Sequence, residues 1–346
     1  MLGDDRAAIK SVLVQVTNSE LSGFGKRCAQ AGLSVTFTAE DTFEAERLRH
    51  MFRALPDVDV VLDQTVLQAP DVVISLQRPP WPDALWLCPS PPSQAPTGAI
   101  PIHFHDDLAE AAFDCASGAD VALAKGFFDQ LGFAVVVCAN GADRFAGLAL
   151  LDAAVALGDR LLLMGALPWE LDAALKVAGY ATGLFAAQDI AGLTGGYARR
   201  TAAGASPLLV TDRMVREGRH GRAVGVGWYR YPGGGGAVID PLIEDMIVEE
   251  AYFAKLRRGV LLDKDAVHYL TLGLACAGAG LIADGTASSG ADVDALCAAL
   301  AGLPPQGCMA VIAGIPIKEV ERTLDVFATD DLALWGHDSL LRYLRG

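Results

Sequence analysis

The chain has 346 residues, 52% of them hydrophobic and 20% charged, and its formal net charge is −15 at pH 7. This length is sufficient for two or three domains with sizeable cores, and the hydrophobic content excludes an intrinsically disordered chain. The negative charge argues against general nucleic-acid binding, which needs a basic surface. The seven cysteines form no Cys-x-x-Cys pair, which is typical of reduced thiols in a cytoplasmic protein.

The chain shows no signal for secretion, for a membrane span or for a metal site. Asp4, Asp5 and Arg6 precede the first hydrophobic run, whereas a signal peptide opens with basic and then apolar residues. No stretch reaches about 18 uninterrupted apolar residues, so no membrane span is expected. The six histidines are dispersed without metal-ligand spacing, and we expect no bound metal. A cytoplasmic location is therefore expected.

The first part of the chain predicts an α/β unit. Residues 11–16 and 34–38 read as strands, and the stretch between them has the apolar spacing of a helix that ends at Gly32. Further strands are expected at 58–62 and 72–76. This β-α-β opening predicts a doubly wound sheet.

The following stretch is rich in proline and ends the α/β pattern. Residues 79–101 contain eight prolines, so no regular structure is expected there. A strand at 100–104, a helix at 120–132 and a strand at 134–138 complete the unit. From Asp143 onward the sequence reads as alanine- and leucine-rich helices, and a domain boundary near 140 is predicted.

The helical half contains an apparent internal repeat. Residues 147–193 and 270–314 each run as an alanine-rich helix, a small-residue turn, a short helix with an acidic residue, a glycine and a hydrophobic helix. A duplication explains this likeness. The alternative is that two alanine-rich helical hairpins look alike by composition alone. The predicted domains are 1–140, 141–245 and 246–346.

A basic loop stands out in this acidic chain. Residues 212–231, DRMVREGRHGRAVGVGWYRY, hold five arginines and four glycines. The glycines argue against a helix, because each costs about 1 kcal/mol in a helix interior. This segment resembles the signature of the C-terminal domain of 3-hydroxyacyl-CoA dehydrogenases. That signature consists of a Gly-Arg-hydrophobic-Gly-Gln-Lys run, a glycine-rich turn and an aromatic pair. Ala223 replaces the lysine of that signature.

Two further segments are similar to the same family. CAQAG at 28–32 fits the helix that follows the family's first strand, and GLFAAQDIAGL at 183–193 fits a segment of its helical domain. In the light of this resemblance, Asp189 and Gly192 shape the packing between helices. The basic loop is then chiefly a structural signature of the helical domain.

The chain most resembles the bacterial members with a duplicated C-terminal helical domain. The resemblance implies an α/β N-terminal Rossmann-like domain, shortened and degenerate, followed by an all-α half with two related helical domains. It implies NAD-linked oxidation of (3S)-hydroxyacyl-CoA to 3-ketoacyl-CoA in fatty-acid or aromatic acyl-CoA oxidation. It also implies an acyl-CoA ligand and a homodimer or a paralogue as partner.

The family's catalytic pair has counterparts in IHFHDDLAEAA at 102–112. In the family a histidine takes the 3-hydroxyl proton and a glutamate orients its imidazole. By resemblance His103 is that histidine and Glu110 that glutamate, although the loop between them is several residues shorter. The alternative is a strand-end histidine beside a solvated acidic turn. His105 has no family counterpart and is expected at the surface.

Weaker counterparts exist for two substrate contacts. An asparagine that contacts substrate in the family corresponds to Asp143, and a serine that contacts the hydroxyl corresponds to Ser90. An aspartate accepts hydrogen bonds but cannot donate them as an amide does. Both residues are therefore secondary candidates.

The dinucleotide fingerprint is degraded. A G-x-G-x-x-G turn lets the backbone approach the pyrophosphate at a helix N-terminus, but residues 16–21 here read VTNSEL. By position, Asn18, Gly23 and Glu40 are the candidates for binding NAD, and Glu20 adds a negative charge in the turn. This loss favours an alternative function, a catalytically degenerate relative that binds acyl-CoA or serves as a scaffold or partner subunit.

Overall fold

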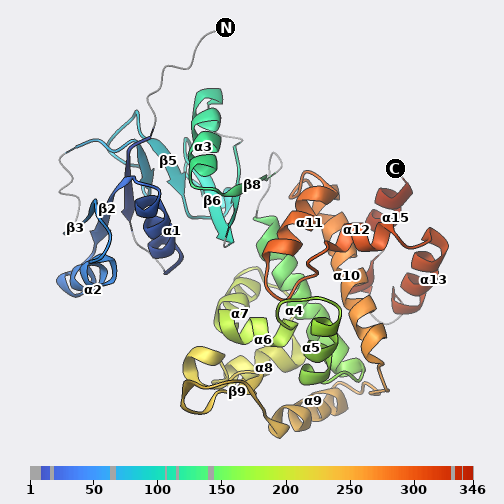
Figure 1. Ribbon diagram of the computed structural model, residues 1–346. Coiled ribbons are helices and arrows are strands. Elements are labelled where there is room, and N and C mark those ends of the chain that lie inside the picture. Colours follow the sequence, from blue (N-terminus) through green and yellow to red (C-terminus); the bar gives the residue numbers. More distant parts are fainter. Residues whose placement is uncertain are drawn as a thin grey trace. The chain divides into compact units, whose positions relative to one another are not determined.

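The computed structural model describes residues 9–15, 19–62, 68–105, 107–113, 117–138, 144–328, 332–336 and 338–345. Two compact units divide the chain, Met1–Phe145 and Ala146–Gly346 (Figure 1). The first is built around a mostly parallel sheet and the second consists almost entirely of helices. The expected fold class, a Rossmann-like α/β domain before an all-α half, is confirmed.

The α/β unit contains an eight-stranded sheet in the order β3-β2-β1-β4-β5-β6-β7-β8 (Figure 1). The strands are β1 (Ser11–Gln15), β2 (Ser34–Ala39), β3 (Val58–Leu62), β4 (Val72–Ile74), β5 (Leu85–Cys88), β6 (Ile100–His105), β7 (Leu108–Ala111) and β8 (Ala134–Val137). Only β6 and β7 pair antiparallel among these strands. The order from β3 to β6 is that of a doubly wound nucleotide-binding sheet.

Among the described residues, three α-helices accompany this sheet, α1 (Ser19–Gln30), α2 (Thr42–Phe52) and α3 (Gly118–Gln130). The core is made of aliphatic strand residues and of phenylalanines such as Phe37, Phe127 and Phe128. Gly25 of α1 lies against the ring of Phe37, and an added Cβ would approach Cε1 of that ring to 2.6 Å. A glycine at this position therefore lets α1 pack closely on β2.

Two strands were not predicted from the sequence. β5 lies inside the proline-rich stretch at 79–101, where regular structure was not expected, and its four residues are all buried. It forms because Leu85–Cys88 is a proline-free apolar run between the prolines. β7 has the sequence Leu-Ala-Glu-Ala, whose residues are also all buried, so it lacks the alternation that marks a half-exposed strand.

The helical unit contains twelve described α-helices and one small hairpin. They are α4 (Ala146–Met164), α5 (Pro168–Val177), α6 (Leu184–Ala191), α7 (Leu193–Ala202), α8 (Leu209–Arg216), α9 (Pro241–Phe253), α10 (Asp263–Ala283), α11 (Gly290–Ala299), α12 (Cys308–Ala313), α13 (Ile317–Ala328), α14 (Leu332–Trp335) and α15 (Asp338–Arg345). The hairpin pairs β9 (Tyr229–Arg230) with β10 (Val238–Ile239). The domain boundary expected at 245–246 falls inside α9.

α10 is the central helix of this unit, since it contacts α4, α5, α12 and α15. By length and composition it is the one helix of the described residues that could cross a membrane, and 61% of its most apolar window is buried inside the structure. A buried core helix of a globular unit can be equally long and apolar. We therefore describe α10 as a core helix.

The two parts of the apparent repeat share a capping device. Asp172 of α5 accepts hydrogen bonds from the N–H groups of Phe185 and Ala186, at the start of α6. Asp294 of α11 accepts in the same way from the N–H groups at positions 309 and 310, at the start of α12. Each carboxylate satisfies N–H groups that have no partner within their own helix. This shared geometry supports the duplication over a likeness of composition.

Candidate functional site

The residues expected to be catalytic lie on the β6–β7 hairpin. The register pairs His103 of β6 directly with Glu110 of β7, so both side chains project from the same face of the sheet. His105, two residues further along β6, projects from that face too. Its Nε2 is hydrogen-bonded to Oε2 of Glu110 at 2.8 Å. The hairpin therefore gathers two imidazoles around one carboxylate.

The expectation that His105 lies at the surface was wrong. Its side chain is only 5% exposed and that of Glu110 is fully buried. A buried carboxylate requires a hydrogen-bond partner, and the diagonal geometry of the hairpin supplies His105. The antiparallel register, in which His105 pairs with Leu108 and His103 with Glu110, sets this diagonal.

His103 lies next to His105 and to an aromatic ring. The ring centroids of the two histidines are 4.5 Å apart in an edge-to-face arrangement. The ring of Phe145 stacks on His103 with centroids 5.5 Å apart. His103 is partly exposed whereas His105 is buried. Of the two imidazoles, His103 is thus the one placed to meet a ligand.

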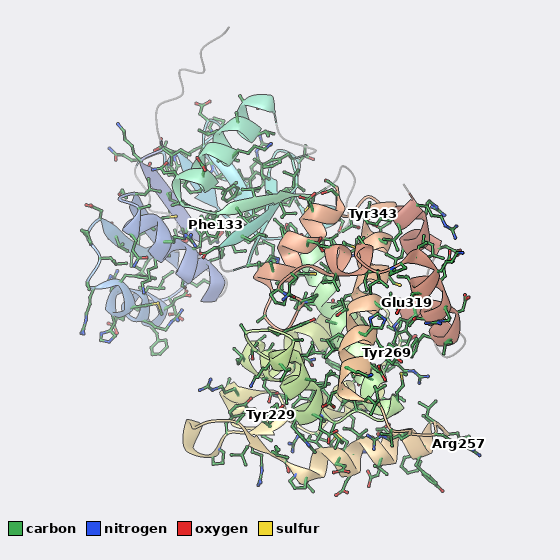
Figure 2. The ribbon with its side chains drawn as sticks, turned by 45° about the vertical axis from the view of Figure 1, so that its right-hand side comes forward. Phe133, Tyr229, Arg257, Tyr269, Glu319 and Tyr343 are labelled. Atoms are coloured by element: carbon green, nitrogen blue, oxygen red, sulfur yellow. The ribbon has the colours of Figure 1, made fainter. Side chains whose placement is uncertain are left out.

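An arginine of α1 holds the hairpin turn. Arg27 forms an ion pair with Asp107 in the turn and donates from Nε to the carbonyl of Leu131 at 2.8 Å. Its guanidinium also lies 4.2 Å from the ring centroid of Phe133, a residue labelled in Figure 2. These contacts connect α1, the β6–β7 hairpin and the end of α3. They therefore restrict the movement of the hairpin that carries the histidines.

Ser90, the weaker serine candidate, follows the carboxyl end of β5. Its hydroxyl lies 3.2 Å from Sγ of Cys88, and its backbone N–H donates to the carbonyl of Cys88 at 2.8 Å. Burial raises the pKa of the Cys88 thiol, so the thiol stays protonated at neutral pH. Ser90 and His103 both lie toward the carboxyl ends of neighbouring strands, where ligands bind in open α/β sheets.

Of the remaining candidates, the two that the structure describes, Gly23 and Glu40, are not gathered into this cluster. Asp143 and Asn18 lie outside the described residues. Gly23 is exposed on α1, and no atom lies within 4 Å of the position of an added Cβ. Glu40 is exposed just after β2, and its backbone N–H donates to Oε2 of Glu44 at 3.0 Å. Asp41 beside it accepts from the N–H of Glu44 as the cap of α2.

The fold implies a dinucleotide at the carboxyl ends of β1 and β2. The exposed Glu40 is suitably placed to accept ribose hydroxyls. Among the described residues, the first turn of α1, which begins at Ser19, contains an acid and no glycine that could cradle the diphosphate. Gly23 is the fifth residue of α1 and therefore lies beyond its first turn. The described residues therefore do not fit NAD in the ordinary glycine-turn mode.

The basic loop of the helical unit is held by a buried carboxylate. Asp189 of α6 accepts from the N–H groups of Trp228 and Tyr229 at 2.8 and 2.9 Å and from the hydroxyl of Tyr231 at 3.0 Å. Burial raises the pKa of Asp189, and its hydrogen bonds from the backbone act in the opposite direction. The hydroxyl of Tyr229, labelled in Figure 2, donates to Asp172 at 2.8 Å.

Several arginines of this loop are bound to acids of the same unit. Arg219 forms an ion pair with Asp240 at 2.6 Å, and Arg213 forms one with Glu217 at 2.7 Å. Arg222 lies over the ring of Tyr231, 5.8 Å from its centroid. These contacts engage three of the five arginines of the loop and support a structural role for it.

Sequence reasoning missed three residues near the candidate sites. His105 was passed over because it has no family counterpart, although its i+2 spacing from His103 on a strand puts both on one face. Gly25 was overlooked in favour of Gly23, and no local signal distinguishes the two. Phe145 contacts His103 across more than forty residues of sequence, a pairing that no local pattern contains.

Comparisons with known proteins agree with this architecture. Residues 145–231 match the family model for 3-hydroxyacyl-CoA dehydrogenase, C-terminal domain. The peroxisomal bifunctional enzyme of Danio rerio is 29% identical over 175 residues, which cover 44% of this chain and 24% of that protein. The chain therefore matches about a quarter of the length of this curated relative.

Two solved structures have a similar fold. The 3-hydroxybutyryl-CoA dehydrogenase from Escherichia coli K12 gives a TM-score of 0.74 at 17% identity, over 97% of this chain and 98% of that one. The dehydrogenase part of multifunctional enzyme 1 from C. elegans gives 0.71 at 15% identity, over 97% and 90% of the two chains. At these identities the likeness shows the fold.

The chain thus has the fold of a two-part dehydrogenase, with a Rossmann-like unit followed by a helical unit. Its resemblance to the 3-hydroxyacyl-CoA dehydrogenases is confirmed, and residues 145–231 carry the C-terminal domain of that family.

Proposed function

We propose that this protein is an oxidoreductase that interconverts (3S)-hydroxyacyl-CoA and 3-ketoacyl-CoA. The observation that supports this function most strongly is the cluster of His103, His105 and Glu110 on the β6–β7 hairpin. A buried carboxylate beside a partly exposed imidazole is the arrangement that general acid–base chemistry requires. The family match of the helical unit supports an acyl-CoA thioester as substrate.

In this proposal His103 accepts the proton of the 3-hydroxyl group during oxidation and returns it during reduction. Glu110 orients the imidazole and balances the positive charge that forms on it. Phe145 confines one face of the His103 ring, so the ring presents its nitrogens in a restricted orientation. Ser90 is placed to contact the hydroxyl group from the neighbouring strand end.

The resemblance implies NAD as the hydride acceptor, and the altered turn before α1 predicts that it binds weakly. The glycine positions that cradle a diphosphate are absent from VTNSEL at 16–21. The test therefore supplies NADH at millimolar concentration. A high KM for NADH together with a usable kcat is the expected behaviour of such a site.

The experiment measures NADH oxidation in the presence of acetoacetyl-CoA, with calorimetry of NADH binding. His103→Ala is expected to lower kcat by roughly 100- to 10,000-fold, the range over which a general base contributes. His50→Ala, at an exposed position on α2, is the matched control and retains activity. Absence of NADH binding at millimolar concentration would reject the dehydrogenase and support the acyl-CoA-binding or scaffold function.

We also propose a cytoplasmic location and a homodimer or paralogue partner. The six cysteines in the part of the chain that the structure describes are buried and form no disulfide bond, which supports a reducing compartment. Sedimentation analysis of the purified chain tests the homodimer, and co-purification from its native cell tests a paralogue.

A further inference from the structure

We propose that His105 is a positioning residue of the active site, which fixes the Glu110 carboxylate so that it can orient His103. This inference rests on the proposed function. His105 has no counterpart in the family motif, His-Phe-Phe-Asn-Pro, which has phenylalanine at the position of His105. The role assigned to His105 is therefore specific to this chain and comes from its hydrogen bond to Glu110.

The β6–β7 hairpin brings both histidines to the Glu110 carboxylate. His103 is directly opposite Glu110 in the strand register, and His105 reaches Oε2 of the same carboxylate along the diagonal at 2.8 Å. A carboxylate has two oxygens and about four acceptor positions. Glu110 binds His105 through Oε2, and the strand register puts its side chain beside that of His103.

Both Glu110 and His105 are buried, so the carboxylate depends on protein groups for its hydrogen bonds. The side chain of Glu110 is fully buried and that of His105 is 5% exposed, so water is not available to hold the carboxylate in place. A buried carboxylate that loses its hydrogen-bond donor takes a different rotamer or becomes protonated. Either change would deprive His103 of an oriented, charged partner, and thus His105 acts on the reaction through Glu110.

The two imidazoles have different roles in this proposal. Their ring centroids are 4.5 Å apart, and a positive charge on both rings at once would be unfavourable at that distance. The partly exposed His103 is the ring that gains a proton from substrate. The Nε2 atom of His105 faces a carboxylate oxygen, which can only accept, so this nitrogen carries the hydrogen of the bond to Glu110.

The test compares His105→Phe with His105→Gln. Phenylalanine fills the buried space but has no donor, whereas glutamine keeps an N–H group for Glu110. We expect His105→Phe to lower kcat by about 100-fold, the loss caused by a misplaced catalytic group, with KM for acetoacetyl-CoA unchanged. His105→Gln is expected to recover at least about tenfold of that loss. Equal activity of the two variants would overturn the proposal, since a packing role favours phenylalanine.

A double-mutant comparison tests whether His105 acts through Glu110. In a Glu110→Gln background the additional change His105→Phe is expected to have little effect on kcat. If the full 100-fold loss appears in that background as well, His105 does not act through the carboxylate.

A spectroscopic measurement separates failure of this proposal from failure of the proposed function. In the substrate-free protein, ¹⁵N chemical shifts of the His103 ring report its tautomer. We expect one tautomer in the wild-type chain and in His105→Gln, and an averaged pattern in His105→Phe. A wild-type chain without dehydrogenase activity rejects the enzymatic role, whereas an unchanged His103 pattern in His105→Phe rejects the positioning role.

Discussion

At the scale of single residues, the buried carboxylate of Asp189 holds the basic loop of the helical unit through hydrogen bonds to its backbone and side chains. Between α8 and β9, Arg222–Val224 form a short 3₁₀ turn, and Gly221 and Val226 form an isolated antiparallel bridge. Asp189 accepts two backbone N–H groups and one hydroxyl from residues 228–231. The φ of Gly221 is +116°, and an added Cβ there would lie 2.6 Å from the carbonyl oxygen of Asp189. The loop thus depends on one aspartate and on glycines that let it approach.

Asp189→Asn is predicted to destabilise the protein by about 3 kcal/mol, because hydrogen bonds to a charged acceptor contribute about 1.5–3 kcal/mol each and are not additive. The amide also turns a donor toward groups that already donate. Urea denaturation followed by tryptophan fluorescence measures the change. Asp245→Asn, at an exposed position of α9, is the control and is expected within about 0.5 kcal/mol of wild type. Equal stability of both variants would contradict the role of Asp189.

Cys276 provides a pH-dependent prediction at the same scale. Burial in α10 raises the pKa of its thiol to about 12, and only the thiolate reacts with alkylating reagents. At pH 8 the thiolate population of Cys276 is expected to be roughly 1,000-fold below that of an unperturbed thiol. Labelling should therefore increase about tenfold for each unit of pH between 8 and 10 in the folded protein.

Peptide mapping after timed alkylation measures this labelling, and the urea-unfolded chain serves as the reference. Fast labelling of Cys276 at pH 8 in the folded state would show that the thiol is accessible and not perturbed by burial.

At the scale of elements, α1 offers a matched pair of glycines on one helix. Gly23 faces open space, whereas a Cβ at Gly25 would collide with the ring of Phe37. Gly23→Ala is predicted to stabilise the protein by up to about 1 kcal/mol, because alanine favours the helix. Gly25→Ala is predicted to destabilise it by about 1–3 kcal/mol through overpacking.

Thermal and urea unfolding of the two variants and of wild type decide this prediction. Effects of the same sign at the two glycines would mean that α1 does not pack on β2 through Gly25.

Much of the fold could be predicted from the sequence because its periodic elements are long or clearly bounded. Strands such as Ser34–Ala39 and helices such as Gly118–Gln130 lie close to their predicted positions. β5 was not predicted because prolines surround it, and β7 was not predicted because alanine and glutamate, which strands disfavour, make up three of its four residues. Tertiary pairing with neighbouring strands, not local pattern, makes them strands.

The candidate site was only partly predictable for the same physical reason. The resemblance identified His103 and Glu110, and the antiparallel register places them opposite each other. The hydrogen bond between His105 and Glu110 depends on the antiparallel register that sets the diagonal of the hairpin. Phe145 reaches His103 only through the fold. Contacts of this kind arise from packing and leave no trace in local spacing.

At the scale of the whole molecule, the chemistry and the family signature lie in different units. The histidine cluster belongs to Met1–Phe145, whereas the family match covers residues 145–231. The core of the α/β unit consists of residues between Ile9 and Phe133. The helical unit is organised around α10 and the capping aspartates of α5 and α11. The family match thus lies in the helical unit, whereas the proposed activity depends on residues of the α/β unit.

Because the helical unit has its own central helix and capped helix starts, residues 146–346 are predicted to fold when expressed alone. The fragment should show a helical far-UV circular dichroism spectrum and cooperative urea unfolding. It should also show near-UV signals from Trp228 and Trp335, both fully buried. Asp189→Asn in the fragment is expected to lower its stability by about 3 kcal/mol, as in the full chain. A fragment with helical far-UV signal but no near-UV signal would show that its packing requires the α/β unit.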